Sequence, residues 1–289
     1  MRFSNLANRR CWIHLPMEIE FLEKEMRMYR FTAVLWLMLA LVGYAGTTAT
    51  STKPALKFTG QGSPDIVDLM KPGNVLKRTA AGPHAMTYHV YVPTTFTTAK
   101  LPPMVIVFSP GGSGSGMLGQ LKDSAEKAGW LAIGCDKLKN SMEKEGIKDK
   151  EEEAMEDEVL NDIFLSIPCQ TNRVYLGGMS GGALRAYWIS ARRKETFAGI
   201  LAYGGWLGGR DFQNKLKFCK GMAVAIINGE SDKNANTWVA GDSAALRRRN
   251  CRIKTFPFPG GHVVAPTEIT DKVMTWLEED WTKIGSKRR

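Results

Sequence analysis

The sequence predicts an α/β domain with a mostly parallel sheet of about eight strands and helices on both faces. Short apolar runs such as Met104–Phe108 (MVIVF) alternate along the chain with longer segments of helical periodicity. Because these runs are apolar at almost every position, we expect strands that are covered on both faces. The 289 residues, 44% of them hydrophobic, suffice for one large domain with a sizeable core.

The expected strands follow one another with helices between most of them. Their ranges are Asn74–Thr79, Met86–Pro93, Met104–Phe108, Trp130–Gly134, Arg173–Leu176, Phe197–Tyr203, Met222–Asn228 and Arg252–Phe258. The first two are expected to pair antiparallel. Helices are expected at Leu121–Ala128, Glu151–Ile167, Ala183–Ala191 and Thr267–Trp281. The charged segment Lys137–Lys150 is expected to be a surface excursion near the functional site, either a lid or an exposed loop.

The N-terminal region has the layout of an export signal. Arg30 and the apolar run Phe31–Val42 are followed by small residues suited to cleavage, which predicts a signal peptide over residues 26–46. The run is shorter than the ~20 residues of a spanning helix, so we expect no stable membrane insertion after cleavage; an uncleaved anchor is the alternative. Residues 1–25 are interpreted as an upstream extension preceding the true start. We expect a secreted or periplasmic protein.

Charge and cysteines narrow the range of partners. The net charge is +10, but the basic residues are scattered, so we predict no nucleic-acid site. An exported protein can form disulfides, and Cys219 and Cys251 each precede a late strand. We predict that these two cysteines pair. The absence of Cys-x-x-Cys spacing argues against a zinc site, and the oligomeric state is left open.

Ser180 is the candidate nucleophile. It lies in Gly178-Met179-Ser180-Gly181-Gly182, after a predicted strand and before a predicted helix. A nucleophilic serine on a tight strand-to-helix turn needs small neighbours on either side. The alternative is a glycine-rich turn with an incidental serine.

The candidate base is chosen by elimination among four histidines. His14 falls in the leader, His84 precedes an early strand and His89 lies within one. His262 follows the last strand in a glycine loop, where a catalytic base is expected.

The candidate acid lies between Ser180 and His262 in the chain. Asp232 follows the strand that ends at Asn228, with Glu230 as a close rival and Asp211 as a weaker one. The order serine, acid, histidine is the one that such folds use. The other interpretation of Asp232 is a turn or helix N-cap.

Backbone N–H groups are expected to form an oxyanion hole. The residue after the nucleophile, Gly181, supplies one donor, and Gly112 or Gly111 in the loop after MVIVF supplies the second. That loop lacks the lysine and spacing of a phosphate-binding loop.

Five segments together resemble the α/β-hydrolase superfamily and, within it, the secreted polyhydroxybutyrate depolymerase and feruloyl esterase group. These are MTYHVYVP, MVIVFSPGG, EDEVLNDIF, NRVYLGGMSGGALRAYW and FPGGH. The resemblance covers Asn74 to Trp281, and we expect an α/β-hydrolase domain over residues 74–289, after a linker and N-terminal segment at 47–73. It implies a triad of Ser180, Asp232 and His262. The chain departs from the group with Ser109-Pro110 in place of His-Gly, and with Lys233 in place of a proline after the acid.

The expected function is therefore that of an exported serine esterase, which needs no metal or cofactor. The alternatives are a serine peptidase of the same fold and a hydrolase-fold binding protein that has lost activity. The substrate is expected to be a small-molecule or polymer-borne ester. Tyr203, Trp206 and Trp238 are the candidate pocket residues.

Overall fold

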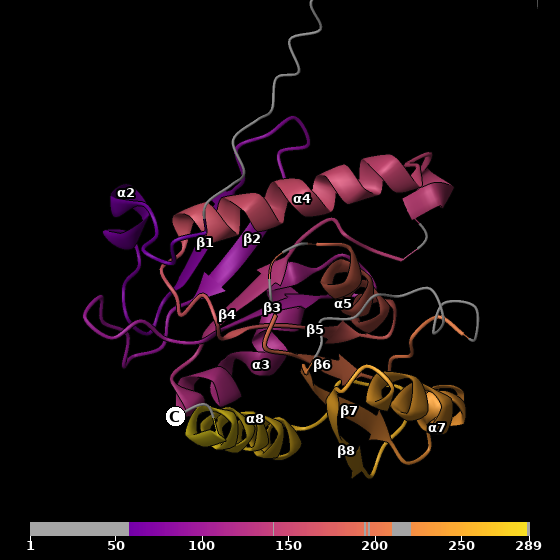
Figure 1. Ribbon diagram of the computed structural model, residues 1–289. Helices are drawn as coiled ribbons and strands as arrows, with labels where there is room; N and C mark the ends of the chain where they lie inside the picture. Colours follow the sequence, from indigo (N-terminus) through magenta and orange to yellow (C-terminus); the bar gives the residue numbers. More distant parts are fainter. Residues whose placement is uncertain (1–57, 141, 194, 196, 210–220, 288–289) are drawn as a thin grey trace, which may run out of the picture. The chain divides into compact units, whose positions relative to one another are not determined.

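The structure, a computed structural model, describes residues 58–140, 142–193, 195, 197–209 and 221–287 (Figure 1). The chain divides into two units, Met1–Ala55 and Leu56–Arg289, and all the described residues belong to the second. The expected upstream extension, the signal peptide and residues 47–57 of the linker and N-terminal segment lie outside them. None of the helices in the described ranges is long and apolar enough to cross a membrane.

The described residues form one sheet of eight strands in the order β1-β2-β4-β3-β5-β6-β7-β8. The strands are β1 Val75–Thr79, β2 Thr87–Tyr91, β3 Met104–Phe108, β4 Leu131–Cys135, β5 Val174–Met179, β6 Gly199–Tyr203, β7 Ala223–Gly229 and β8 Arg252–Phe258. β2 is antiparallel to β1 and β4, and the pairs from β4 to β8 are parallel. This confirms the predicted mostly parallel sheet.

Helices cover both faces of the sheet, as predicted (Figure 1). They are α2 Pro64–Val67, α3 Gly114–Ala128, α4 Asp149–Ser166, α5 Gly181–Arg192, α7 Lys233–Arg247 and α8 Thr267–Lys287, with a 3-10 turn, η1, at Met142–Glu145. Buried residues of α3 and α8 share one core with the sheet, and those of α4, α5 and α7 share the other. The sheet is therefore the middle layer of three.

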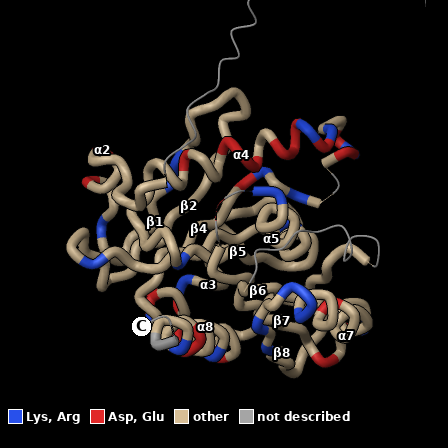
Figure 2. Tube along the Cα trace, viewed as in Figure 1, with Lys and Arg blue, Asp and Glu red and all other residues tan. Residues whose placement is uncertain are grey.

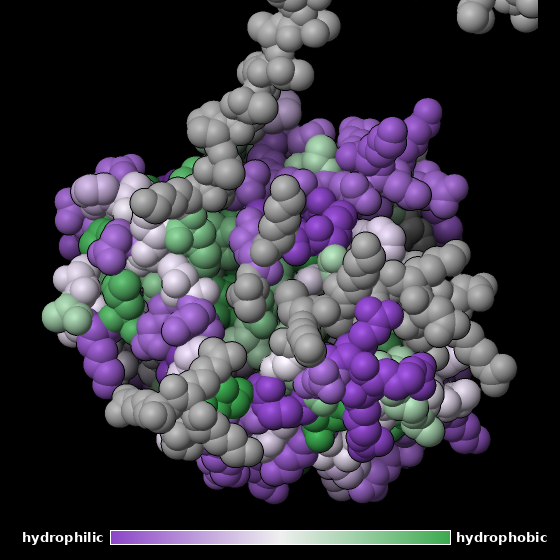
Figure 3. Space-filling model, viewed as in Figure 1, coloured by the Kyte–Doolittle hydropathy of each residue, from purple (hydrophilic) through white to green (hydrophobic). Residues whose placement is uncertain are grey.

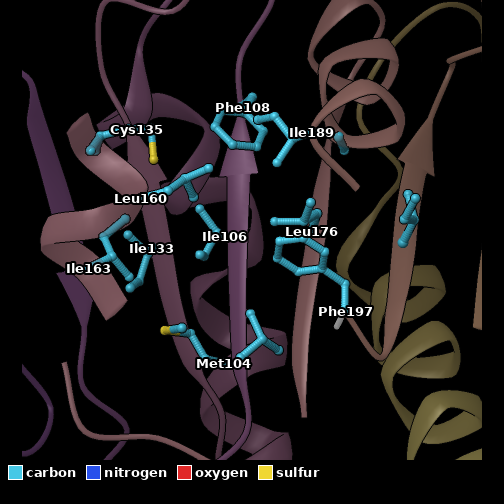
Figure 4. Packing of buried hydrophobic residues seen from close by; sticks show 14 of the residues in the cluster. Met104, Ile106, Phe108, Ile133, Cys135, Leu160, Ile163, Leu176, Ile189 and Phe197 are labelled. Carbon is cyan, nitrogen blue, oxygen red and sulfur yellow. The ribbon is translucent and has the colours of Figure 1, made fainter. Parts of the chain in front are cut away.

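Strand β3 shows why its apolar run predicted a buried strand. Met104, Ile106 and Phe108 point into the core under α4 and α5 (Figure 4). Val105 and Val107 point to the opposite face and pack with α3 and α8. Because side chains alternate between two covered faces, every position of β3 is apolar.

Three element boundaries differ from the prediction by three residues or more. Helix α3 begins at Gly114 rather than Leu121, because the Ser113 side chain accepts the Gly116 N–H (3.1 Å) and the Asp136 carboxylate accepts the Gly114 N–H (2.8 Å). Strand β5 continues past Leu176 to Met179, since it pairs there with both β3 and β6. Helix α8 continues beyond its apolar stripe to Lys287.

Acidic residues dominate α4, whose one basic residue is Lys150, whereas charged residues of both signs are interspersed along α8 (Figure 2). Hydrophilic residues cover the N-terminal end of α4 (Figure 3). This end follows the predicted surface excursion, whose Leu138 and Met142 are nevertheless buried. The charged segment Lys137–Lys150 is therefore anchored to the core through these two side chains.

Candidate active site

The three candidate catalytic residues come together at the carboxyl edge of the sheet. Strand β5 ends one residue before Ser180, and its last residue, Met179, pairs with Tyr203 at the end of β6. Strands β7 and β8 also end together, and the loops that follow them carry Asp232 and His262. Open α/β sheets bind ligands at this edge.

Ser180 lies on a strained turn between β5 and α5. Its φ of 55° and ψ of −118° lie outside the common regions for a residue with a side chain. The Ser180 N–H donates to the Tyr203 carbonyl (2.8 Å), and its own carbonyl accepts the Ala183 N–H (3.0 Å). These bonds hold the turn in a conformation that would otherwise be unfavourable.

The flanking glycines are required by the closeness of β3. A β-carbon on Gly178 would lie 2.5 Å from the Phe108 carbonyl oxygen, and one on Gly182 would collide with the same oxygen. Only glycine at both positions lets the end of β5 and the start of α5 pack against β3. The glycines on both sides of Ser180 in the pentapeptide are therefore required for steric reasons.

Asp232 is the carboxylate that pairs with His262. Its Oδ2 lies 2.6 Å from His262 Nδ1, while Oδ1 accepts the Ala235 N–H (3.1 Å) at the start of α7. Asp232 therefore contacts His262 and caps α7 at the same time. The rival Glu230 is exposed, and Asp211 lies outside the described residues.

The exposure of the pair suits proton transfer. The Asp232 side chain is 2% exposed, whereas that of His262 is 47% exposed. A carboxylate only accepts hydrogen bonds, so Nδ1 carries the proton and Nε2 is left as the basic nitrogen. The Ser231 N–H donates to the Gly260 carbonyl (2.8 Å), which ties the loop of Asp232 to that of His262.

Ser180 lies where three cavities meet. It shares two of them, of about 560 and 400 Å³, with His262. The first is also lined by Pro110, Gln120, Met179, Val263 and Val264. Within the described part of the chain the Ser180 hydroxyl makes no hydrogen bond to the His262 ring. Hydrogen bonds between catalytic side chains are often long until a substrate binds.

The two predicted second oxyanion donors are already engaged inside their own loop. The Gly111 N–H donates to Ser109 Oγ (3.2 Å), and the Gly112 N–H donates to the Ser109 carbonyl (3.1 Å). Gly181, the first residue of α5, lines a third cavity of about 540 Å³ together with Ser180.

Two of the three predicted pocket residues line the cavities. Trp206 and Trp238 lie beside Ser180 and His262, with ring centroids 4.5 Å apart. Tyr203 is fully buried, and its hydroxyl donates to Thr270 Oγ1 (3.3 Å). The prediction for Tyr203 is wrong because alternation along β6 turns its side chain into the core under α3 and α8.

The third cavity contains residues that the sequence did not indicate. Besides Ser180, Gly181 and Trp206, it is lined by Lys139, Asn140, Asp149, Glu152, Glu153, Glu156, Leu184, Arg185 and Trp188. The acidic members come from α4, which lies beside α5 in space (Figure 1). The sequence placed Lys137–Lys150 near the site but gave no signal for the glutamates of α4, because the polar face of a helix is the usual solvent face.

The cysteines are buried or lie outside the described residues. Cys135 and Cys169 are buried, and burial raises the pKa of the Cys169 thiol to about 12. Cys219 lies outside the described residues, so its pairing with Cys251 stays a prediction. No group of His, Cys, Asp and Glu that could hold a metal ion occurs in the described ranges.

No family model and no curated protein matches this sequence. The structure resembles an S-formylglutathione hydrolase from Agrobacterium tumefaciens with a TM-score of 0.52 and 14% identity, over 71% of this chain and 94% of that one. Est1E from Butyrivibrio proteoclasticus matches with a TM-score of 0.53 and 14% identity, over 71% of this chain and 99% of that one. A ferulic acid esterase matches with a TM-score of 0.52 and 15% identity, over 73% of this chain and 98% of that one. The chain therefore has the α/β-hydrolase fold.

Proposed function

We propose that this chain is a serine esterase in which Ser180, His262 and Asp232 form the catalytic triad. The observation that carries the proposal is the 2.6 Å hydrogen bond between His262 and a buried Asp232, beside a serine on a strained turn. The shared cavities give an ester access to Ser180 and His262 together. The similar structures named as hydrolases and esterases support the same chemistry.

The geometry suits acyl transfer through a covalent intermediate. Ser180 Oγ attacks the ester carbonyl carbon while His262 Nε2 takes the hydroxyl proton. Asp232 stabilises the imidazolium, and the Gly181 N–H donates to the oxyanion. Collapse of the intermediate expels the alcohol, which receives the proton from His262. Water then repeats the sequence on the acyl-enzyme and regenerates Ser180.

The cavities support a carboxylic ester of modest size, either free or at the end of a polymer. Their volumes of about 400 to 560 Å³ lie in the range of small-molecule pockets. Trp206 and Trp238 offer aromatic surface on one side of Ser180, and Val263 and Val264 offer aliphatic surface on another. We also propose that residues 26–46 direct export to the periplasm or the medium.

A fluorophosphonate probe tests the enzyme and its location together. We expect the full chain, expressed from Met1, to label in the periplasmic or secreted fraction, and Ser180→Ala not to label. Equal labelling of the variant would overturn the assignment of the nucleophile, and label confined to the cytoplasm would overturn export. Hydrolysis of p-nitrophenyl esters but not of a peptide anilide separates an esterase from a peptidase. An inactive binding protein would neither label nor hydrolyse.

A further inference from the structure

The oxyanion hole needs a second donor beside Gly181. Acyl-transfer sites stabilise the tetrahedral oxyanion with preorganised N–H groups, usually two or more. Gly111 and Gly112, the expected second donors, already donate to Ser109. The side-chain amide of Asn140 is a donor group that lies against Gly181.

Asn140 packs directly on the Cα atom of Gly181. A β-carbon built on Gly181 would collide with Asn140 Oδ1 and lie 2.6 Å from Nδ2. Asn140, Gly181 and Ser180 line the same cavity. Asn140 is exposed to it, and its side-chain amide makes no hydrogen bond in the described part of the chain. Its two N–H donors are thus available, since a rotation about χ2 exchanges nitrogen and oxygen.

The backbone around Asn140 is fixed from two sides. The Asn140 N–H donates to the Pro110 carbonyl (2.8 Å). The preceding carbonyl, that of Lys139, accepts from Arg185 Nη2 (3.1 Å). Arg185 belongs to α5, the helix that begins at Gly181, so the Asn140 loop and the first donor are attached to one rigid element.

Arg185 is itself held in place. Its guanidinium is buried and pairs with Glu156, which is 2% exposed, and with Glu152 at 2.5 Å, both on α4. A buried, doubly paired guanidinium has little freedom to move. The carbonyl that it binds is therefore fixed, and Asn140 follows directly after it. This is the preorganisation that electrostatic stabilisation requires.

We propose that Asn140 Nδ2–H is the second oxyanion donor, acting with the Gly181 N–H on the intermediate formed at Ser180. The proposal rests on the proposed esterase function. As Ser180 Oγ bonds to the carbonyl carbon, the carbonyl π electrons move to oxygen, and the amide donates a hydrogen bond to it without giving up its proton. It also accounts for Gly181, because any side chain there would displace the Asn140 amide.

The test is steady-state hydrolysis of a p-nitrophenyl ester by the full chain carrying Asn140→Ala or Asn140→Asp. We expect kcat to fall about 10²- to 10³-fold for Asn140→Ala with KM nearly unchanged. Asn140→Asp keeps the shape, lacks the N–H and adds a negative charge, so its kcat should be at least as low. The affinity of a trifluoromethyl ketone, which forms a tetrahedral adduct, should fall by the same factor as kcat/KM. Asn74→Ala, at an exposed asparagine before β1, is the matched control and should keep wild-type rates.

The outcomes separate this proposal from the one on which it rests. A wild-type chain without esterase activity, or an active Ser180→Ala variant, would overturn the proposed function. If the wild type is active and the kcat of Asn140→Ala lies within about threefold of the wild-type kcat, the role of Asn140 is overturned while the proposed function stands. Activity restored in Asn140→Asp relative to Asn140→Ala would overturn it too, because the carboxylate has no N–H to donate and only its shape would then matter.

Discussion

Two histidine–aspartate pairs of the same composition occur in different surroundings in this molecule. In one, His262 Nδ1 lies 2.6 Å from Asp232, in the loops after β8 and β7. In the other, His89 Nε2 lies 2.9 Å from Asp136 Oδ2, and this hydrogen bond joins β2 to the residue that follows β4. Both pairs involve one ring nitrogen and one carboxylate oxygen, so the hydrogen bond itself does not distinguish them.

The exposure of the two partners distinguishes the pairs. At His262 the ring is 47% exposed and the carboxylate 2% exposed, whereas His89 and Asp136 are 14% and 18% exposed. A buried carboxylate behind an open ring leaves the second ring nitrogen accessible to a substrate. The open ring, and the cavities that it shares with Ser180, make the first pair suitable for catalysis.

The second pair has a different set of partners. Besides His89, Asp136 accepts the Thr87 hydroxyl (2.9 Å) and the Gly114 N–H (2.8 Å). One carboxylate thus connects β2, the end of β4 and the first residue of α3. Its hydrogen bonds serve to position α3, so the same two residue types act here as a structural connection.

The largest expected effect is the contrast between the two histidines. His262→Ala should lower kcat for a p-nitrophenyl ester on the order of 10⁴- to 10⁶-fold, because the base is lost. His89→Ala should keep kcat within about threefold and instead lose about 1.5–3 kcal/mol of unfolding free energy, because one hydrogen bond to a charged group is lost. Steady-state kinetics and urea unfolding measure the two effects. If a stably folded His89→Ala variant lost its activity, the distinction between a catalytic His262 and a structural His89 would be wrong.

The acid gives the next largest effect. Asp232→Asn should lower kcat about 10⁴-fold, because the amide cannot stabilise the imidazolium. Asparagine caps helices as well as aspartate does, so the bond to Ala235 and the melting temperature should be preserved. Glu230→Gln is the matched control, and at its exposed position it should keep wild-type kcat. Equal losses in the two variants would contradict the assignment of Asp232.

Local signals explain what could be predicted from the sequence. The turn at Ser180 is specified by glycines one or two residues away, so its motif was readable along the chain. The positions of Asp232 and His262 followed because strand ends in a parallel sheet meet at one edge. The start of α3 was missed because glycines disfavour helix, and its stabilising partner Asp136 lies 22 residues further on.

Contacts between distant elements explain what could not be predicted. Asn140 lies in a charged segment with no pattern, and it reaches Gly181 through the hydrogen bonds of its loop with Pro110 and Arg185. The engaged N–H groups of Gly111 and Gly112 are likewise a property of the folded loop. Residue type and spacing predicted the candidate nucleophile and its candidate partners, but not the donor groups that lie around them.

The smallest expected effect concerns Asp136 and acid stability. Burial acts to raise the pKa of this carboxyl, but the hydrogen bonds from Thr87, Gly114 and His89 outweigh it and hold the pKa below its usual range. A carboxyl whose pKa is lower in the folded state than the ~3.9 of an unfolded chain contributes stability above that pH. This contribution is lost as the pH falls through the folded-state pKa.

Asp136→Asn should therefore be less stable than the wild type at pH 7, by about 1–2 kcal/mol. The gap should narrow as the pH falls below about 4, because the wild type then loses the charge that the variant never had. Urea unfolding of both proteins at several pH values measures the gap, and esterase activity at pH 7 should stay near that of the wild type. If the difference in unfolding free energy between the two proteins does not change with pH, the charge of Asp136 contributes nothing to the stability of the fold. A loss of activity as large as that of Asp232→Asn would mean that the two pairs do not differ in role.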